Sequence, residues 1–208
     1  MGKTTALITG AARRIGRQIA FDLAEDGLDI VAHYRSSSGD AEELKDKLTD
    51  RGVKVYLEQA DFGREEDISR FIPDLKNRVG KIDILVNNAS VFPPGQLEDL
   101  EFEDLMENIK INSWAPFSLT RQFATRYYEG KIVNLLDTRI AGYDWNHAGY
   151  YFSKVLLARM TKMLALKFAP DFTVNGVAPG LVIPPEGYDE SYLQERTDRV
   201  PLKRHGEV

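Results

Sequence analysis

Short apolar runs alternate with longer amphipathic segments along this chain. The expected strands cover residues 4–9, 29–33, 54–59, 82–87, 131–136 and 173–177. The expected helices cover residues 15–26, 40–51, 65–79, 102–128 and 150–168. Strands and helices in regular alternation are typical of a parallel sheet with helices on both faces. The pattern therefore predicts an α/β fold with a doubly wound parallel sheet.

Neither an internal repeat nor a linker interrupts the pattern, so residues 1–208 are expected to form a single domain. Glycines stand just past several expected helices, where a left-handed cap is needed. These are Gly27, Gly52, Gly80 and Gly130. Residues 180–201 are rich in Pro, Asp and Glu, and we expect them to be part loop and part short helix, close to the substrate.

Composition narrows the class of protein. The chain has 208 residues, of which 43% are hydrophobic and 28% charged, which fits one soluble globular domain with a buried core. Its formal net charge of −5 gives no basic surface for nucleic acid. It has no cysteine and no cluster with metal-ligand spacing, so we expect neither a disulfide nor a metal site.

The chain also carries no recognisable membrane or export signal. No apolar run approaches the roughly 20 residues that a membrane span needs. Its first residues lead straight into an expected strand, so we see no signal peptide. We therefore expect a cytoplasmic protein that does not bind membranes.

A tyrosine and a lysine, Tyr150 and Lys154, stand four residues apart in an expected helix. At this spacing both side chains lie on one face of the helix. The lysine charge can lower the phenol pKa from about 10 toward neutrality, worth roughly 4 kcal/mol for a shift of about three units. A tyrosine tuned in this way can transfer a proton at working pH.

The turn after the first expected strand carries glycines at two key places. Residues 9–16 read Thr-Gly-Ala-Ala-Arg-Arg-Ile-Gly, with Gly10 and Gly16 in the outer glycine places of a dinucleotide turn and Arg14 in the middle one. Such a turn lets the backbone approach a pyrophosphate at a helix N-terminus. Taken alone it could be a plain strand-to-helix turn. Together with Tyr150 and Lys154, it indicates a nicotinamide-dependent oxidoreductase.

The end of the second expected strand favours NADP(H) over NAD(H). An acidic residue would bind the NAD ribose here, but residues 32–37 read Ala-His-Tyr-Arg-Ser-Ser. A cation and hydroxyls suit a 2′-phosphate, and Arg13 and Arg35 are the expected charge partners. The alternative is that Arg35 and the serines cap the helix that starts near Asp40.

These residues resemble the short-chain dehydrogenase/reductase family across nearly the whole chain. Asn87, Asn88 and Ala89 resemble that family's Asn-Asn-Ala-Gly element, with Ser90 in place of the glycine. Three members of its catalytic tetrad are matched, by Asn112, Tyr150 and Lys154. Pro179 and Gly180 resemble its Pro-Gly after the sixth strand, and Asp61 falls where an acidic residue meets the adenine. The resemblance implies a Rossmann-like sheet and a homo-oligomer, dimer or tetramer.

Within the family the resemblance is to the pteridine reductases and the related dihydromonapterin reductases. It is carried by residues 9–16, 33–36, 87–90 and 174–177. In that subgroup a serine and an aromatic residue after Asn-Asn-Ala contact the pterin, and Ser90 and Phe92 stand at these places. Phe92 would then stack on the substrate opposite the nicotinamide. The alternative is that it only anchors the loop before Pro93.

The fourth tetrad position departs from the family. Most members have a serine there, but this chain has Asp137 followed by Thr138. An ionised carboxylate cannot donate a hydrogen bond, so it suits a substrate with N–H groups rather than a ketone. The pteridine reductases also carry an aspartate at this place. Two alternatives remain: Asp137 is a strand-end cap, or Thr138 is the hydroxyl donor.

The site expected from these residues has three parts. The catalytic residues are Asn112, Asp137, Tyr150 and Lys154. The substrate residues are Arg14, Ser90, Phe92, Asp137 and Tyr150. The NADP(H) residues are Gly10, Arg13, Arg14, Ile15, Gly16, His33, Tyr34, Arg35, Ser36, Asp61, Asn88, Ala89, Ser90, Pro179 and Gly180.

In the expected reaction hydride passes to a stacked heterocycle, and Tyr150 supplies the proton with help from Asp137. Lys154 binds the nicotinamide ribose, and Asn112 positions a link to Lys154. Two other functions stay open: a reductase of carbonyls such as 3-oxoacyl thioesters, and a non-catalytic NADP sensor.

Trp145 and His147 precede Tyr150 and could line the substrate mouth, although a surface role is favoured for His147.

Family members usually continue past the last residues of this sequence with another helix and a seventh strand. Either the given chain is truncated at Val208 or its end is built differently, and the sixth strand is expected at the sheet edge.

Overall fold

The computed structural model describes residues 3–184, 187, 189–198 and 200–206. In this part of the chain six parallel strands form one sheet in the order β3-β2-β1-β4-β5-β6. The strands are β1 (Thr5–Ile8), β2 (Asp29–Tyr34), β3 (Val55–Gln59), β4 (Ile84–Asn87), β5 (Gly130–Leu135) and β6 (Phe172–Val177). The doubly wound α/β fold and all six expected strands are confirmed.

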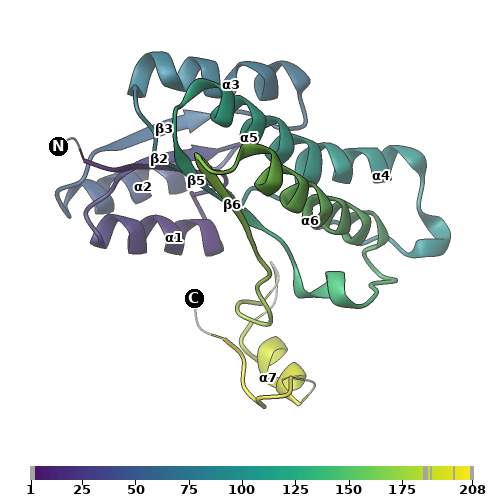
Figure 1. Cartoon of the computed structure of the whole chain (residues 1–208). Coiled ribbons are helices and arrows are strands. Elements are labelled where there is room, and N and C mark those ends of the chain that lie inside the picture. The colour runs from purple at the N-terminus through teal and green to yellow at the C-terminus, as the bar shows by residue number, and fades with distance from the viewer. Residues whose placement is uncertain (1–2, 185–186, 188, 199, 207–208) are drawn as a thin grey trace.

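Helices cover both faces of the sheet (Figure 1). One face carries α1 (Arg14–Glu25) and α2 (Ser38–Thr49). The other carries α3 (Glu65–Val79), α4 (Phe102–Ile109), α5 (Ala115–Arg126) and α6 (Ala148–Phe168). A short helix, α7 (Ser191–Thr197), lies on a C-terminal segment that projects from the body (Figure 1).

Two apolar layers, one on each face of the sheet, form the core. Successive strand side chains point to opposite faces, so Leu7 joins the layer under α3, α5 and α6. Its neighbours Ala6 and Ile8 join the layer under α1 and α2. Strands buried on both faces explain why the sequence shows continuous apolar runs rather than alternation.

The order of the strands reverses between β1 and β4. Ile8 pairs with Val86 in the register of these strands, and the amide of Thr9 donates to the carbonyl of Val86 at 2.9 Å. Ligands of open α/β sheets bind at the carboxyl ends of the strands beside such a reversal. The glycine turn after β1 and the Asn-Asn-Ala segment after β4 therefore share the expected site.

The helix expected over residues 102–128 is wrong as one continuous element. A π-helical turn, Lys110–Trp114, separates α4 from α5. Pro116 follows this turn and has no N–H to donate to the carbonyl of Asn112, four residues earlier, so the regular bonding is interrupted there. Such turns recur at functional sites, and this one contains the buried Asn112.

The segment expected to be part loop and part short helix is confirmed where it is described. Helix α7 falls within residues 180–201, while residues 185, 186, 188 and 199 lie outside the described part. β6 lies at an edge of the sheet as described. None of the described helices is long and apolar enough to span a bilayer.

Candidate functional site

The glycine turn is built so closely that a side chain would be strained at Gly10 and would clash at Gly16. Gly10 has φ +65°, a left-handed conformation. A Cβ on Gly16 would lie 2.2 Å from the carbonyl oxygen of Gly10 and 2.5 Å from Nδ2 of Asn88. That amide donates to the carbonyls of Thr9 and Gly10 at 2.8 and 3.1 Å. Asn88 therefore fastens the turn to the end of β4.

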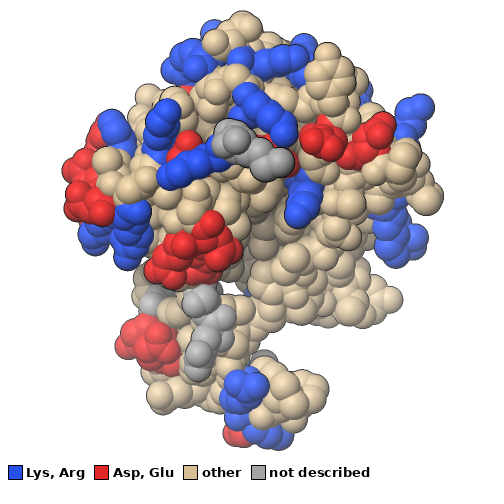
Figure 2. Space-filling model, turned by 60° about the vertical axis from the view of Figure 1, so that its left-hand side comes forward, with Lys and Arg blue, Asp and Glu red and all other residues tan. Residues whose placement is uncertain are grey.

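Arg14 takes the left-handed conformation that the middle glycine would otherwise supply, with φ +55°. This costs an ordinary residue about 1 kcal/mol or more. Its Nη2 donates to the carbonyl of Pro184 at 2.7 Å. Arg14 therefore joins the turn to the C-terminal segment, and Figure 2 shows the surface hollowed where that segment leaves the body.

The buried ring of His33 supports the turn through a hydrogen bond to Gly10. The amide of Gly10 donates to its Nδ1 at 3.0 Å, so Nε2 carries the proton and donates to the carbonyl of Ala60 at 3.1 Å. The ring is 3% exposed and stacks on Phe62 at 4.2 Å. Burial lowers the pKa of His33 to about 4, so the ring is neutral and can accept this bond.

Acid is expected to destabilise the protein through His33. The folded-state pKa lies below the unfolded value of 6.5, so the unfolded chain takes up the proton first. The associated stability, about 3 kcal/mol, is complete above pH 6.5 and is lost as pH falls toward 4. Urea denaturation at a series of pH values measures it. His33→Asn should flatten this loss while His205→Asn should not, and an unchanged slope in His33→Asn would contradict the assignment.

Two cavities flank Gly10. The larger, of about 400 Å³, lies between the turn, the Asn-Asn-Ala segment and the C-terminal segment. Its lining comprises Gly10, Arg13, Arg14, Ile15, Gly16, Asn88, Ala89, Ser90, Phe92, Asp137, Arg139, Tyr150, Gly180, Leu181, Val182, Ile183 and Tyr192. The smaller, of about 210 Å³, comprises Gly10, His33, Arg35, Ser36, Ser37, Ala60, Asp61, Phe62, Ala89, Ser90, Val91 and Ile111.

Most of the sequence-predicted residues therefore gather around these cavities, and a few do not. Tyr34 ends β2 outside both linings as the described residues define them. Pro179, Asn112 and Lys154 are not among the described residues that line either cavity. The carbonyl of Pro179 accepts the hydroxyl of Thr138 at 3.4 Å. Nε of Arg13 donates to Oδ2 of Asp40 at 2.6 Å, so an anion at this end would compete with that carboxylate.

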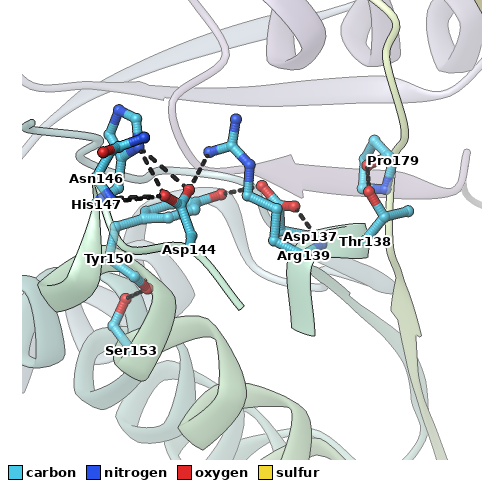
Figure 3. A network of polar contacts seen from close by, with 9 residues as sticks. All are labelled: Asp137, Thr138, Arg139, Asp144, Asn146, His147, Tyr150, Ser153 and Pro179. Atoms are coloured by element: carbon cyan, nitrogen blue, oxygen red, sulfur yellow. Dashed lines mark hydrogen bonds and ion pairs between the residues drawn. The ribbon is translucent and has the colours of Figure 1, made fainter. Parts of the chain in front are cut away.

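Tyr150 and Asp137 meet in the larger cavity. The Tyr150 hydroxyl donates to Oδ2 of Asp137 at 2.7 Å, while Oδ1 accepts the amide of Arg139 at 2.7 Å (Figure 3). One carboxylate therefore serves both purposes: Oδ1 caps the turn after β5, and Oδ2 contacts the phenol. Burial, followed by the charge of Asp137 and its hydrogen bond, raises the pKa of Tyr150 well above its usual value.

The expectation that Lys154 brings the Tyr150 pKa toward neutrality is wrong. The Lys154 Nζ donates to the carbonyl of Leu135 at 2.8 Å and lies 5.6 Å from the centre of the phenol ring. Asp137 is the charge that contacts the hydroxyl. Burial lowers the pKa of Lys154 itself to about 8, partly opposed by Asp137. Tyr150 is therefore a neutral phenol whose proton is directed at Asp137.

Asn112 holds the segment after β4 against α6. Its Oδ1 accepts the amide of Val91 at 2.8 Å and the hydroxyl of Ser90 at 3.0 Å. Its Nδ2 donates to the carbonyl of Val91 and to the hydroxyl of Ser153, both at 3.0 Å. The π-helical turn thus places a buried amide where it fixes the loop that carries Phe92. The predicted link from Asn112 to Lys154 stays a prediction.

Phe92 forms an aromatic wall of the larger cavity. Its ring meets Tyr150 edge-on at 4.6 Å between centroids, and it stacks on His147 at 4.0 Å with 13° between the planes. The guanidinium carbon of Arg139 lies 4.9 Å from its centroid. His147, favoured for a surface role, is partly exposed at 23% and packs on Phe92 without lining either cavity as the described residues define them.

Asp144 organises this wall and was not found from the sequence. It accepts the amides of Asn146 and His147 at 3.0 and 3.1 Å (Figure 3). It also pairs with Nη1 of Arg139 at 3.0 Å and with Nδ1 of His147 at 3.1 Å. An aspartate whose carboxylate takes amides two and three residues on is a recognisable turn signal just before a helix.

Trp145 lines a different cavity. It is 58% exposed and stacks with Tyr143 at 5.5 Å. Together with Leu97 and Phe152 it lines a separate cavity of about 240 Å³. Trp145 is not among the described residues that line the larger cavity, so the structure does not bring it to the expected substrate site.

The chain resembles known proteins over most of its length. The model of the short chain dehydrogenase family matches residues 4–188. The 3-oxoacyl-[acyl-carrier-protein] reductase FabG of Staphylococcus epidermidis is 30% identical, with 98% of this chain and 86% of that protein covered. FolM alternative dihydrofolate reductase 1 of Brucella suis, solved in complex with NADP, is 29% identical with a TM-score of 0.91, covering 98% of this chain and 83% of that one. Acetoin dehydrogenase YohF of Salmonella typhimurium is 25% identical with a TM-score of 0.89, covering 99% and 84%.

Proposed function

Because the chain belongs to the short-chain dehydrogenase/reductase family of enzymes, we propose that it reduces a pteridine or dihydrofolate-like heterocycle with NADPH. Relatives of this chain have names that cover different substrates, so the family alone does not choose one. The choice rests on the residues around Asp137 and Tyr150.

The two cavities that meet at Gly10 fit the two ends of a dinucleotide. Arg35 and Ser36 line the smaller cavity with a cation and a hydroxyl, which supports NADP(H) over NAD(H). Asp61 lines it too and would meet the adenine. The glycine turn, Asn88 and Ala89 would hold the pyrophosphate and the nicotinamide half. The complexes of the Brucella FolM proteins with NADP support the same cofactor.

The observation that carries the proposal is the 2.7 Å contact between Asp137 and the Tyr150 hydroxyl inside the cavity that Phe92 also lines. A carboxylate beside the proton donor accepts hydrogen bonds and would repel the oxygen of a ketone. A heterocycle with N–H groups would donate to it, and its flat ring would pack against the part of Phe92 that His147 and Arg139 leave exposed. Charge and shape at this place therefore suit a pterin.

The chain's own residues supply the proton and the orientation. NADPH, when bound, supplies the hydride. Tyr150 holds its proton at neutral pH, as a phenol does, and Asp137 fixes the position of its hydroxyl at 2.7 Å, so Tyr150 would act as the general acid. Lys154 would hold the nicotinamide ribose. Asn112 fixes the loop of Ser90 and Phe92 through Val91.

A second candidate is a reductase of carbonyls, including 3-oxoacyl thioesters. It is favoured by the 30% identity to a 3-oxoacyl-[acyl-carrier-protein] reductase. Such chemistry needs a hydroxyl donor at the fourth tetrad place. Thr138 could supply it, but its hydroxyl donates to Pro179 at 3.4 Å and it is not among the residues that line the larger cavity.

The two candidates are separated by NADPH oxidation with dihydrobiopterin, dihydrofolate and a panel of ketones side by side. We expect turnover with the pterins and little with the ketones. Asp137→Ser should lower the kcat/KM ratio of pterin to ketone by about tenfold or more, because it replaces an acceptor with a donor. Thr138→Val is the matched control and should leave that ratio unchanged. Ketone turnover alone in the unmodified protein would overturn the proposal.

A further inference from the structure

We infer that Arg139 determines specificity within the proposed reaction by binding an anionic substituent of the substrate, as in the carboxylate tail of a folate-type molecule. The inference rests on the proposed function and goes beyond it, since it separates conjugated from unconjugated pterins. Arg139 is not among the site residues expected from the sequence.

Arg139 is tied to the reacting groups by its own backbone. Its amide donates to Oδ1 of Asp137 at 2.7 Å, and Oδ2 of the same carboxylate accepts the Tyr150 hydroxyl at 2.7 Å. Its side chain lines the same 400 Å³ cavity. Its guanidinium carbon lies 4.9 Å from the centre of the Phe92 ring. The guanidinium thus lies over a ring that His147 also covers by stacking at 4.0 Å, and a heterocycle that packs against the remaining exposed part of Phe92 would have this cation beside it.

Asp144 holds this guanidinium in place. Nη1 of Arg139 lies 3.0 Å from Oδ2 of Asp144, whose side chain is only 9% exposed. The same carboxylate also accepts the amides of Asn146 and His147 and faces the His147 imidazole (Figure 3). Because several donors share its charge, Asp144 orients Arg139 without fully neutralising it.

The geometry leaves the guanidinium able to take a second anion. Arginine has five N–H donors, and the ion pair with Asp144 is made through Nη1. The side chain is 35% exposed, so a flexible substituent could reach it from solvent. A guanidinium that is already oriented loses less entropy on binding, and it matches a carboxylate with two parallel hydrogen bonds. A neutral side chain on the pterin would gain none of this.

The inference is tested by the kcat/KM for dihydrofolate, which carries a glutamate, divided by that for dihydrobiopterin, which has a neutral side chain. Arg139→Met should lower this ratio about tenfold, mostly through the KM for dihydrofolate, because one charge-assisted contact is lost. In the unmodified protein the KM for dihydrofolate should also rise with salt more than that for dihydrobiopterin.

Arg121→Met is the matched control. Arg121 also lies over a phenylalanine ring, that of Phe117 at 5.5 Å, but on the exposed surface of α5. It should leave the ratio unchanged. Arg139→Lys keeps the charge but cannot make two parallel hydrogen bonds to a carboxylate, so it should restore part of the ratio. Partial recovery in this variant would also show that the loss in Arg139→Met is not caused by misfolding.

The outcomes separate the inference from the proposed function. Turnover of both pterins with the same ratio in the unmodified protein, Arg139→Met and Arg139→Lys would overturn the inference alone. If the unmodified protein turns over neither pterin, the proposed function fails and the inference fails with it.

Discussion

Replacing Tyr150 with phenylalanine is expected to lower kcat with a pterin by about 10²–10⁴-fold, the usual contribution of a positioned proton donor. The hydroxyl that disappears is the one that donates to Asp137 at 2.7 Å. The ring itself can keep its edge-on contact with Phe92, at 4.6 Å between centroids. Chemistry should therefore fail while the shape of the cavity is retained.

The same variant should bind NADPH with nearly unchanged affinity. The reason is that the glycine turn and Asn88 hold the expected cofactor cavity together through contacts that do not involve the phenol. Steady-state kcat and a separate titration of NADPH fluorescence measure the two effects. Tyr151→Phe removes a hydroxyl one residue away and serves as the control, with kcat expected to stay close to normal.

Two results would contradict this assignment. Normal turnover in Tyr150→Phe would show that another group donates the proton. A loss of NADPH affinity with kcat unchanged at saturating NADPH would show that the phenol acts on binding rather than on the chemical step.

The site residues that could be predicted are those marked by short local signals in the sequence. The glycine turn, the apolar strands and the Tyr-Lys pair each depend on a few neighbouring positions, and the sheet brings them together by its topology. The break in the helix after Ile109 also had a local signal. Pro116 stands in the middle of the expected helix, and a proline there removes one backbone hydrogen bond.

The electrostatics of Tyr150 depended on residues far apart along the chain. Helical spacing brings Lys154 near the phenol, but Asp137, which lies just after β5, contacts the hydroxyl directly at 2.7 Å. The nearer charge and burial decide the direction of the pKa shift. Spacing within one helix therefore singled out the proposed proton donor but gave the wrong direction for its pKa.

The aromatic wall could not be read from the sequence because it depends on how two loops meet. The amide of Gly95 donates to the carbonyl of Asn146, and the amide of Ala148 donates to the carbonyl of Gly95. These bonds bring His147 onto Phe92, which stands over 50 positions earlier in the sequence. Neither loop has a periodic pattern that would predict the other as its partner.

Gly16→Ala is expected to abolish most NADPH binding and to destabilise the fold. The added Cβ would stand 2.2 Å from the Gly10 carbonyl oxygen, a backbone atom that cannot rotate away, and 2.5 Å from Nδ2 of Asn88. Relieving such a clash costs about 1–3 kcal/mol. It also moves the turn whose amides would face the pyrophosphate, so the Kd for NADPH should rise by about tenfold or more.

Gly39→Ala is the matched control because it adds the same methyl group within α2, where nothing lies within 4 Å of the new Cβ. A helix gains about 1 kcal/mol from this change, so the control should be equally or more stable and should bind NADPH normally. Thermal unfolding and NADPH fluorescence measure both variants. Normal NADPH affinity in Gly16→Ala would mean that the turn does not hold the pyrophosphate. A loss in both variants would mean that binding responds to the general stability of this half of the sheet rather than to the turn.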